Sequence, residues 1–357
     1  MIVVTPEKVR SEIAAVCALS QFNEYIRSHI IDEADLSPAA VAAGATNYLE
    51  ARHHVAEPLQ WKVFSHCASV TRLYALYEGF VYELISAWVK AVPSLYSSYA
   101  RMPEAIVNQH RVGVGVLLQK FGGGYRNEQL TELRIIEPLY FGLSGQEEFS
   151  LVSDAFFIDL RNLRHDELCG LFNKVSLDNL GGWLGGHMEL QAVCNLAGTT
   201  VVGQLKELVD FRNEASHARQ EIDETLGVSE IQQIAQFIQL LCDALHEFVL
   251  IRYFDALQEV GRLESLGRIT KYFPRPDATI LAVDKPVQIN VGDEIVARGD
   301  RVCIATTIVS LQNAGISIET AKANQGNEIG VKFRSSVKKE GLTIYRISSS
   351  RLEGDSG

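Results

Sequence analysis

The sequence of 357 residues lacks the long apolar segments of a membrane protein. No uncharged apolar run approaches the ~20 residues that a membrane helix needs, and the longest candidate, residues 190–205, is interrupted by polar residues and glycines. The N-terminal string MIVVTPEK lacks the basic start and long apolar core of a secretory signal. We therefore expect neither a secretory leader nor a membrane contact.

Cysteine is also sparse, and its spacing excludes the usual cysteine-based sites. The six cysteines are scattered, and no two have the C-x-x-C spacing of a zinc site or form a disulfide framework. Such cysteines are typical of buried thiols in a reducing compartment, which favours a cytoplasmic location. We expect no metal and no cofactor.

A phosphate-binding loop is absent as well. Two glycine-rich strings occur, FGGGY at 121–125 and GGWLGG at 181–186. Neither follows an apolar strand, and neither carries the Gly-Lys-Ser/Thr ending of a P-loop. We interpret both strings as hinges between helices.

Positive charge is scarce in the first three-quarters of the chain. The formal net charge is −11; residues 275–357 hold 11 Lys and Arg against 10 Asp and Glu, and residues 1–274 hold 22 against 34. An acidic protein does not attract nucleic acid through its overall field. Any nucleic-acid site must therefore depend on a few local cations.

Helical periodicity dominates residues 1–268, which we predict to be one all-helical domain. Thr5-Pro6-Glu7 is a typical helix start, and the apolar series from Val9 to Ile30 has a period near 3.6. The last two helices are joined by IDETLGV, so we expect them to pack as an antiparallel pair. The predicted helices after the first cover residues 37–56, 58–93, 165–177, 187–217 and 229–263, of which 187–217 and 229–263 are the last two.

The pattern changes near TKYFPRPDA (270–278), where prolines cluster and short β-rich runs begin. Residues 269–273 are interpreted as a linker and residues 350–357 as a disordered tail. Between them, residues 274–349 contain seven short runs separated by turn residues. Because seven short strands would otherwise leave exposed edges, we predict a small closed antiparallel β-barrel after a mainly α-helical domain.

The stretch LVDFRNEASHARQE (208–221) carries the main candidate site. Arg212 continues the apolar stripe of its helix, although a guanidinium is rarely buried without a partner. It therefore indicates an ion pair, a groove or a subunit interface. Asn213 and His217 lie four residues apart and share a neighbouring face, and Ser216 is a supporting candidate beside them.

Other polar residues offer alternative sites. RNLRHDE (161–167) also contains an arginine and a histidine, Arg161 and His165, but their spacing equally suits a turn leading into a helix. Glu78 lies among aromatic residues, either as an ordinary polar or ion-paired position or as support for Arg212. The adjacent His53 and His54 diverge on a helix, which does not favour metal binding.

The string Arg212-Asn213-x3-His217, within LKELVDFRNEASHA, resembles the R-x4–6-H motif of HEPN-domain ribonucleases of the RiboL-PSP and MAE type. SVTRLYALYEGFVYELISAWV (69–89), with Glu78, resembles an early helix of that family. DLRNLRHDELCGLFNKVSLDNL (159–180) resembles a segment between these elements. The resemblance covers about residues 60–250 and implies a HEPN-type helical bundle.

The resemblance also implies metal-independent RNA cleavage at a composite site of two HEPN domains, and hence a homodimer. In that reading His217 moves the proton of the ribose 2′-OH, and Arg212 stabilises the charged phosphate. Asn213 orients His217 or donates to the phosphate. Some HEPN toxins have a tyrosine two residues after the histidine, which a partner enzyme modifies. Here that residue is Arg219, which could add a cation to an RNA groove.

The C-terminal region resembles the small β-barrel that is the second domain of translational GTPases. The resemblance rests on VGDEI (291–295), SLQ (310–312), EIGVKF (328–333) and a late K-x-G-x-x-I-Y pattern. It implies a module that targets an RNA substrate, the alternative being a solvated basic surface on a structural barrel. The candidate RNA-binding cations are Lys332, Arg334, Lys338, Lys339 and Arg346.

The sequence thus favours a HEPN endoribonuclease, a toxin or antiphage-defence effector with tRNA among its candidate substrates and an antitoxin or defence protein among its candidate partners. Two alternatives stay open. One is a non-catalytic HEPN protein that binds RNA or scaffolds a complex. The other is a regulatory partner, such as an antitoxin, whose acidic surface occupies a basic groove.

Overall fold

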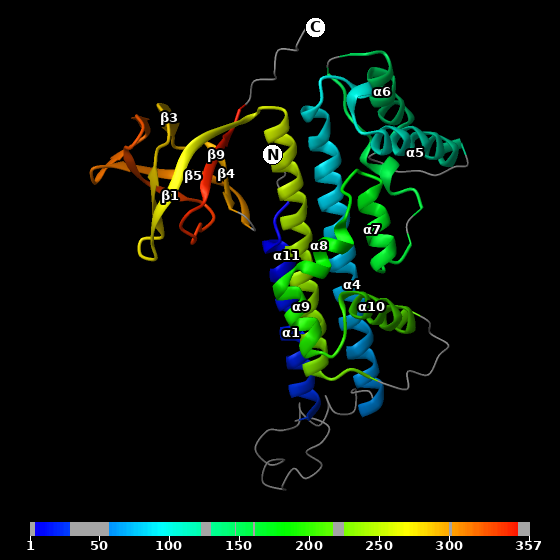
Figure 1. Cartoon of the computed structure of the whole chain (residues 1–357). Helices are drawn as coiled ribbons and strands as arrows, with labels where there is room; N and C mark the ends of the chain where they lie inside the picture. Colours follow the sequence, from blue (N-terminus) through cyan, green and yellow to red (C-terminus); the bar gives the residue numbers. More distant parts are fainter. Residues whose placement is uncertain are drawn as a thin grey trace, which may run out of the picture.

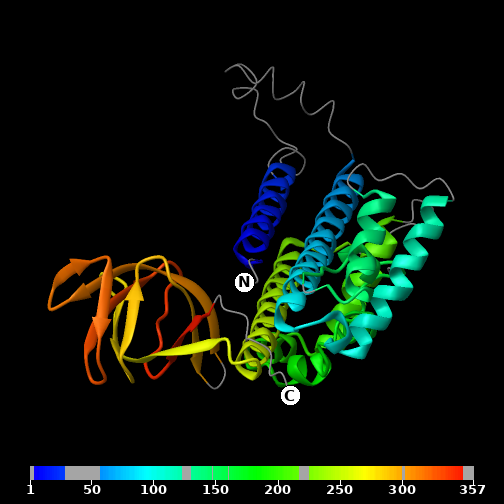
Figure 2. The same cartoon turned by 90° about the horizontal axis from the view of Figure 1, so that it is seen from above.

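The computed structural model describes residues 4–28, 57–122, 130–146, 148–159, 161–216, 225–299 and 302–348. A helical domain is followed by an antiparallel β domain, as predicted, and the β domain lies to one side of the helices (Figures 1 and 2). The described helices are α1 (Glu7–Arg27), α4 (Pro58–Ala91), α5 (Glu104–Gly122), α6 (Glu132–Leu143), α7 (His165–Asn173), α8 (Leu180–Gly186), α9 (Met188–Leu196), α10 (Val201–Ser216) and α11 (Val228–Glu259).

Three long helices, α1, α4 and α11, lie side by side and form the centre of the helical domain (Figures 1 and 2). Their shared core is large and apolar, and the rings of Trp88 and Tyr253 meet edge to face at 6.4 Å. In length and composition, α11 alone among the described helices could cross a membrane, and 61% of its most apolar window is buried inside the protein. The apolar character of α11 is that of a core helix.

The predictions for the first helices are confirmed in part. α4 fills the range predicted for residues 58–93. Phe64, one of the apolar positions on which that helix was predicted, is nevertheless 73% exposed. In α1, Val9, Ile13 and Val16 are buried as expected, whereas Leu19 and Tyr25 are 61% and 58% exposed. The predicted helix at 37–56 lies outside the described residues.

Three local predictions are wrong. GGWLGG is not a hinge but most of α8, because Leu180 and Leu184 are buried and Trp183 Nε1 donates to the carbonyl of Ala244 in α11. The helix predicted over 187–217 is two helices, separated at Gly198, whose φ of +66° interrupts the helix. α10 packs mainly across α4 and not as an antiparallel partner of α11.

A buried histidine ties α5 to the segments beside it. His110 is fully buried, and its Nε2 accepts a hydrogen bond from the backbone N–H of Val152 at 3.1 Å. Its Nδ1 lies 3.0 Å from the hydroxyl of Tyr99. Burial lowers the pKa of His110 to about 4, so the imidazole is neutral near pH 7.

The β domain forms a closed barrel, as predicted. β4 pairs with both β9 and β5, which closes the ring β4-β9-β1-β2-β8-β5, while β6 extends β5 and β3 pairs with β7. The strands are β1 (Leu263–Phe273), β2 (Ala278–Ala282), β3 (Val287–Asn290), β4 (Glu294–Gly299), β5 (Val302–Asn313), β6 (Ile316–Ile318), β7 (Thr320–Ala323), β8 (Glu328–Phe333) and β9 (Thr343–Ile347).

The boundary between the domains differs from the predicted one. β1 occupies residues 263–273, which include the predicted linker, and it pairs with β2 and β9. The barrel rests against the end of α11, where the rings of Phe254 and Tyr345 meet edge to face at 5.2 Å. The Arg298 guanidinium lies 5.1 Å from the Phe254 ring and 3.5 Å from the Asp255 carboxylate. The predicted tail at 350–357 lies outside the described residues.

Candidate functional site

Helix α10 places Arg212 at the edge of the core, against α4. Val201, Leu205, Leu208 and Val209 are buried, which confirms the predicted stripe. Arg212 is half-buried, and its guanidinium carbon lies 5.2 Å from the centroid of the Tyr74 ring. The arginine is therefore held by a cation–π contact, and none of the described carboxylates forms an ion pair with it.

Asn213 is fixed by two hydrogen bonds to one atom. Its Oδ1 accepts from Nη1 of Arg212 at 3.2 Å and from Nδ2 of Asn162 at 3.0 Å. Both donors meet the carbonyl end of the side chain, so the NH2 end of Asn213 points away from them. Arg212 and Asn213 thus form one ordered pair, anchored to a segment 51 residues earlier.

Glu78 lies one side chain away from Arg212. The hydroxyl of Tyr74 donates to Oε1 of Glu78 at 3.0 Å and accepts from the backbone N–H of Leu163 at 3.0 Å. Burial, more than the nearby Glu78 charge, raises the pKa of Tyr74 to about 12. The described contacts thus connect Glu78 to Arg212 only through Tyr74, and a supporting role of Glu78 stays a prediction.

The segment RNLRHDE, weighed as a rival motif, belongs to the same site. Besides the Asn162–Asn213 bond, Nη2 of Arg164 lies 2.5 Å from Oδ1 of Asp210 in α10. The hydroxyl of Tyr77 donates to the carbonyl of Leu163 at 3.1 Å, which fixes the segment on α4. Asn162 was missed by the sequence reasoning, although the Arg-Asn pair at 161–162, repeated at 212–213, was a signal for it.

The histidine of the rival segment has its polar contacts on its own helix, α7, and packs beside Gly181 of α8. His165 Nδ1 lies 3.1 Å from Oδ1 of Asp166, and its Nε2 lies 3.8 Å from Sγ of Cys169 on the same helix. Burial raises the pKa of Cys169, which keeps the thiol protonated. The structure gives no contact between His165 and Arg212.

The other residues predicted in and beside the motif are Ser216, His217 and Arg219. The hydroxyl of Ser216 donates to the carbonyl of Arg212 at 2.8 Å, so this side chain bonds back to its own helix. His217 and Arg219 lie outside the described residues, and their roles stay predictions. The described helix α10 ends at Ser216, directly before the histidine.

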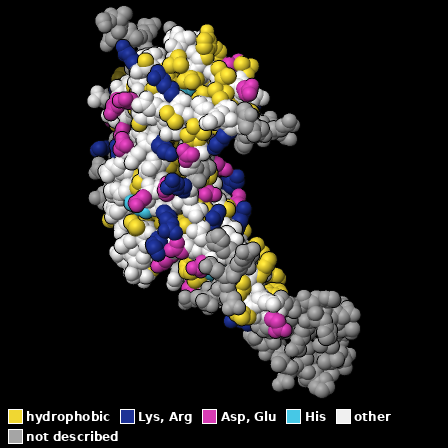
Figure 3. All heavy atoms as spheres, turned by 90° about the vertical axis from the view of Figure 1, so that its right-hand side faces the viewer, with side chains coloured by type: hydrophobic (Ala, Val, Ile, Leu, Met, Phe, Trp, Pro, Cys, Tyr) yellow, Lys and Arg dark blue, Asp and Glu magenta, His cyan; other side chains and the backbone are white. Residues whose placement is uncertain are grey.

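The face that carries α7 and α10 has mixed charge. Figure 3 shows basic and acidic side chains across the middle of this side and hydrophobic side chains toward the end formed by α5 and α6. The exposed hydrophobic residues of α6 are Leu133, Ile136, Tyr140 and Leu143. The cations of these elements include Arg161, just before α7, and Lys206, on α10, and each lies beside a carboxylate.

The predicted cations of the β domain fall into two groups. Lys332, Arg334, Lys338 and Lys339 are exposed. Arg346 differs, because its Nη2 lies 2.5 Å from Oε2 of Glu264 and its Nη1 lies 3.1 Å from Oδ2 of Asp293. These two carboxylates engage the Arg346 guanidinium inside the barrel, so it is placed as a cross-link between strands and not as a surface cation.

Helix α10 thus places an arginine–asparagine pair against the long helix α4, where Tyr74 contacts the arginine. The sequence matches the family model described as HEPN_MAE_28990-like HEPN over residues 35–254, which is more than half of the chain. The chain therefore belongs to this HEPN family, and its membership indicates a nuclease or RNA-related role.

Comparison with curated proteins gives no match. Among solved structures, the chain is similar to GDP-bound aIF5B from Aeropyrum pernix, with 19% identity over 34% of this chain and 23% of that chain, and a TM-score of 0.19. The chain thus spans less than a quarter of that protein. A likeness this weak carries no argument about the role of the β domain.

Proposed function

We propose that this protein is a metal-independent endoribonuclease whose catalytic residues are Arg212, Asn213 and His217. The observation that carries the proposal is the fixed Arg212–Asn213 pair. Tyr74 holds the guanidinium from one side, and Asn162 holds the Asn213 carbonyl from the other. A purely structural arginine at this depth would be expected to have a carboxylate partner.

The proposed chemistry is attack by a ribose 2′-OH on the adjacent phosphate. His217 accepts the 2′-OH proton as the new O–P bond forms, and the bond from phosphorus to the 5′-oxygen breaks. The leaving 5′-oxygen takes up a proton from a histidine or water. The products are a 2′,3′-cyclic phosphate and a 5′-OH, and no metal is needed to generate the nucleophile.

Arg212 and Asn213 suit the charged phosphate of this reaction. A guanidinium already placed by a cation–π contact stabilises the added negative charge with little reorganisation. The NH2 end of Asn213, left over by its two accepted bonds, supplies a neutral donor beside it. Both side chains are half-buried, so a ligand can reach them.

We further propose that two copies of α10 meet, so that His217 of one copy faces the groove of the other. Five residues on one helix are about 140° of rotation, which separates Arg212 from His217 on a straight helix. If a second copy of the protein supplies the histidine, Arg212 and His217 of one helix do not have to face the same ligand. The same proposal places the protein among toxins or antiphage effectors, kept inactive by an antitoxin or other partner.

Cleavage assays test this function directly. The wild-type protein and His217→Ala are incubated with tRNA and with total RNA, each with and without EDTA. The proposal predicts EDTA-resistant cleavage by the wild type and none by the variant. His165→Ala is the matched control, since it removes the histidine of the rival segment and should leave cleavage intact.

Toxicity on expression tests the biological part of the proposal. Expression of the wild type should arrest growth of a bacterial host, and Arg212→Ala should relieve the arrest. Because Arg212 packs on Tyr74, the variant must be shown to be folded by circular dichroism. Equal growth with wild type and folded variant would remove the toxin assignment and leave the cleavage assay to decide the enzymatic one.

A further inference from the structure

The outer face of the barrel carries two arginines in one cross-strand row. Thr343 on β9 pairs with Arg268 on β1 and with Arg298 on β4. Neighbouring strands are about 4.8 Å apart and paired residues point to the same face, so the two arginines flank Thr343 about 10 Å apart. Their chain neighbours Ile269, Ala297 and Ile344 are buried in the barrel, which places the row outside.

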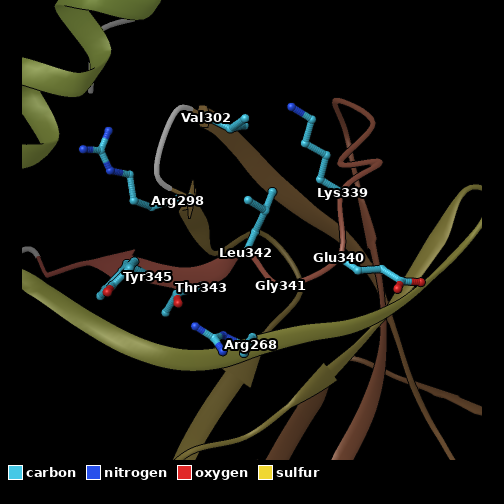
Figure 4. Close-up of a pocket in the computed structure, with 10 residues that line it drawn as sticks. Arg268, Arg298, Val302, Lys339, Glu340, Gly341, Leu342, Thr343 and Tyr345 are labelled. Atoms are coloured by element: carbon cyan, nitrogen blue, oxygen red, sulfur yellow. The ribbon is translucent and has the colours of Figure 1, made fainter.

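This row lines an open depression of about 850 Å³ (Figure 4). Lys339 stands at its rim, and Tyr345 lies farther along β9. The described residues that line the depression include three basic side chains and one acidic side chain. Such a concentration of positive charge is a local exception in a chain with a net charge of −11.

The single acidic side chain does not neutralise the depression. Oε1 of Glu340 accepts a hydrogen bond from the backbone N–H of Tyr272 at 3.2 Å, and Figure 4 shows the Glu340 side chain directed away from the arginines. Arg268 and Lys339 are exposed, and neither forms an ion pair with any described carboxylate. Arg298 is partly engaged, because Asp255 lies 3.5 Å from it.

Nη1 of Arg298 is an unsatisfied donor. This atom is buried, and no described group accepts a hydrogen bond from it. Because this atom is buried, a ligand in the depression meets Arg298 through the rest of its side chain, which is 23% exposed and supplies a nearby positive charge. With the hydroxyl of Thr343 between two arginines, the row matches the needs of a phosphate oxygen.

The depression suits a backbone more than a base. Tyr345 is the only aromatic residue among its described lining residues, and its ring is half-buried against Phe254. A base therefore finds no free aromatic face for stacking. The charges, by contrast, lie on an open surface that a strand can cross.

We propose that Arg268, Thr343 and Arg298, with Lys339, bind the phosphate backbone of the RNA that the helical domain cleaves. This assignment rests on the proposed ribonuclease function for the identity of the ligand. The proposed RNA site is narrower than the general basic surface expected on the barrel. It consists of one row of residues beside α11, and Arg346 is not part of it.

Binding is measured by fluorescence anisotropy with a labelled single-stranded RNA, over a salt range of about 50 to 200 mM. All proteins carry His217→Ala, so the RNA stays intact. Arg268→Ala/Lys339→Ala removes two exposed cations that have no described ion-pair partner. Lys322→Ala/Lys90→Ala is the matched control, since it removes two exposed lysines away from the depression. Thr343→Val tests the hydroxyl with little change in shape.

The inference predicts that the Arg268→Ala/Lys339→Ala protein binds RNA at least about tenfold more weakly, with a salt slope lower by about 1.4, because each single-strand phosphate contact contributes about 0.7. Thr343→Val should weaken binding by a few-fold, and the control pair should change neither quantity. Equal losses in the control pair, or no loss in the test pair, would overturn the inference.

Competition separates the two sources of nucleotide phosphate. AMP and inorganic phosphate are added to the bound RNA at equal concentrations. Weak and equal displacement supports backbone recognition, whereas strong displacement by AMP alone would identify a free nucleotide as the ligand and overturn the assignment. Wild-type cleavage is assayed separately. Cleavage without depression-dependent binding overturns this inference alone, and depression-dependent binding without cleavage overturns the proposed function alone.

Discussion

Nδ2 of Asn162 donates to Oδ1 of Asn213 over 3.0 Å, joining the segment before α7 to the motif helix α10. The bond occupies the carbonyl end of the Asn213 amide and leaves its NH2 end available to a ligand. If Asn213 acts on the phosphate, Asn162 is a positioning residue for it, and its contribution should show in turnover more than in RNA affinity.

Asn162→Ala should therefore lower kcat by roughly tenfold and leave KM nearly unchanged, because misplaced donors weaken mainly the transition state. Steady-state cleavage of a defined RNA gives both constants. Asn173→Ala, at the exposed end of α7, is the control and should match the wild type. An Asn162→Ala protein with unchanged kcat would remove the positioning role.

Tyr74 allows its ring and its hydroxyl to be tested separately. Tyr74→Phe keeps the ring under Arg212 but leaves the N–H of Leu163 without its acceptor. We expect a loss of about 1–3 kcal/mol in the free energy of unfolding, with cleavage largely retained. Tyr74→Leu should lose stability and cleavage together. Urea unfolding and the RNA assay check both, and full activity in Tyr74→Leu would contradict the role of the ring.

Because of the buried His110, we expect the free energy of unfolding of the protein to fall in acid. The folded pKa of His110, about 4, lies below the unfolded value of about 6.5, because burial favours the neutral form. The unfolded chain takes up a proton first, so the stabilisation is complete above about pH 7 and is lost as the pH falls toward 4. The pKa values of His66 and His246 are also lowered by burial, which adds to the same trend.

For His110 alone, the difference between a folded pKa of about 4 and an unfolded pKa of about 6.5 corresponds to about 3 kcal/mol in the free energy of unfolding. Urea unfolding at a series of pH values measures it, and His110→Gln should flatten the profile because an amide can still accept from Val152. An imidazole that titrates near pH 6.5 in the folded protein, observed by NMR, would disprove this explanation.

We expect Arg346 to contribute to the stability of the β domain and not to RNA binding. Arg346→Ala leaves the carboxylates of Glu264 and Asp293 without their shared partner, which should lower the free energy of unfolding by about 1–3 kcal/mol. Lys332→Ala, an exposed change on β8, should cost almost nothing. A stable Arg346→Ala protein that loses RNA binding would show that Arg346 binds RNA and does not serve mainly as a structural cross-link.

Periodicity was enough to predict the parts of the fold that depend on local pattern. α4, the buried stripe of α10 and most barrel strands follow from the spacing of apolar residues. β1 was missed because its burial does not alternate regularly: Leu266 and Gly267 are both buried at a β-bulge, and the turn at Gly261 that ends α11 was interpreted as helix. GGWLGG was misjudged because packing of Leu180, Leu184 and Trp183 outweighs the low helix propensity of glycine.

The candidate site was predictable only in part for a similar reason. Arg212 and Asn213 are adjacent, so the sequence shows them together. Tyr74, Glu78 and Asn162 reach them only through tertiary packing across α4 and the segment before α7. No spacing rule reports such contacts, which explains why RNLRHDE was weighed as a rival and not as part of the same site.

The proposed ribonuclease function is tested most directly by cleavage of a defined RNA by the purified wild-type protein in EDTA, with the products analysed for cyclic phosphate. We expect cleavage to 2′,3′-cyclic phosphate and 5′-OH ends, lost in His217→Ala and in folded Arg212→Ala. Cleavage that requires a divalent metal, or that persists in folded His217→Ala, would contradict it.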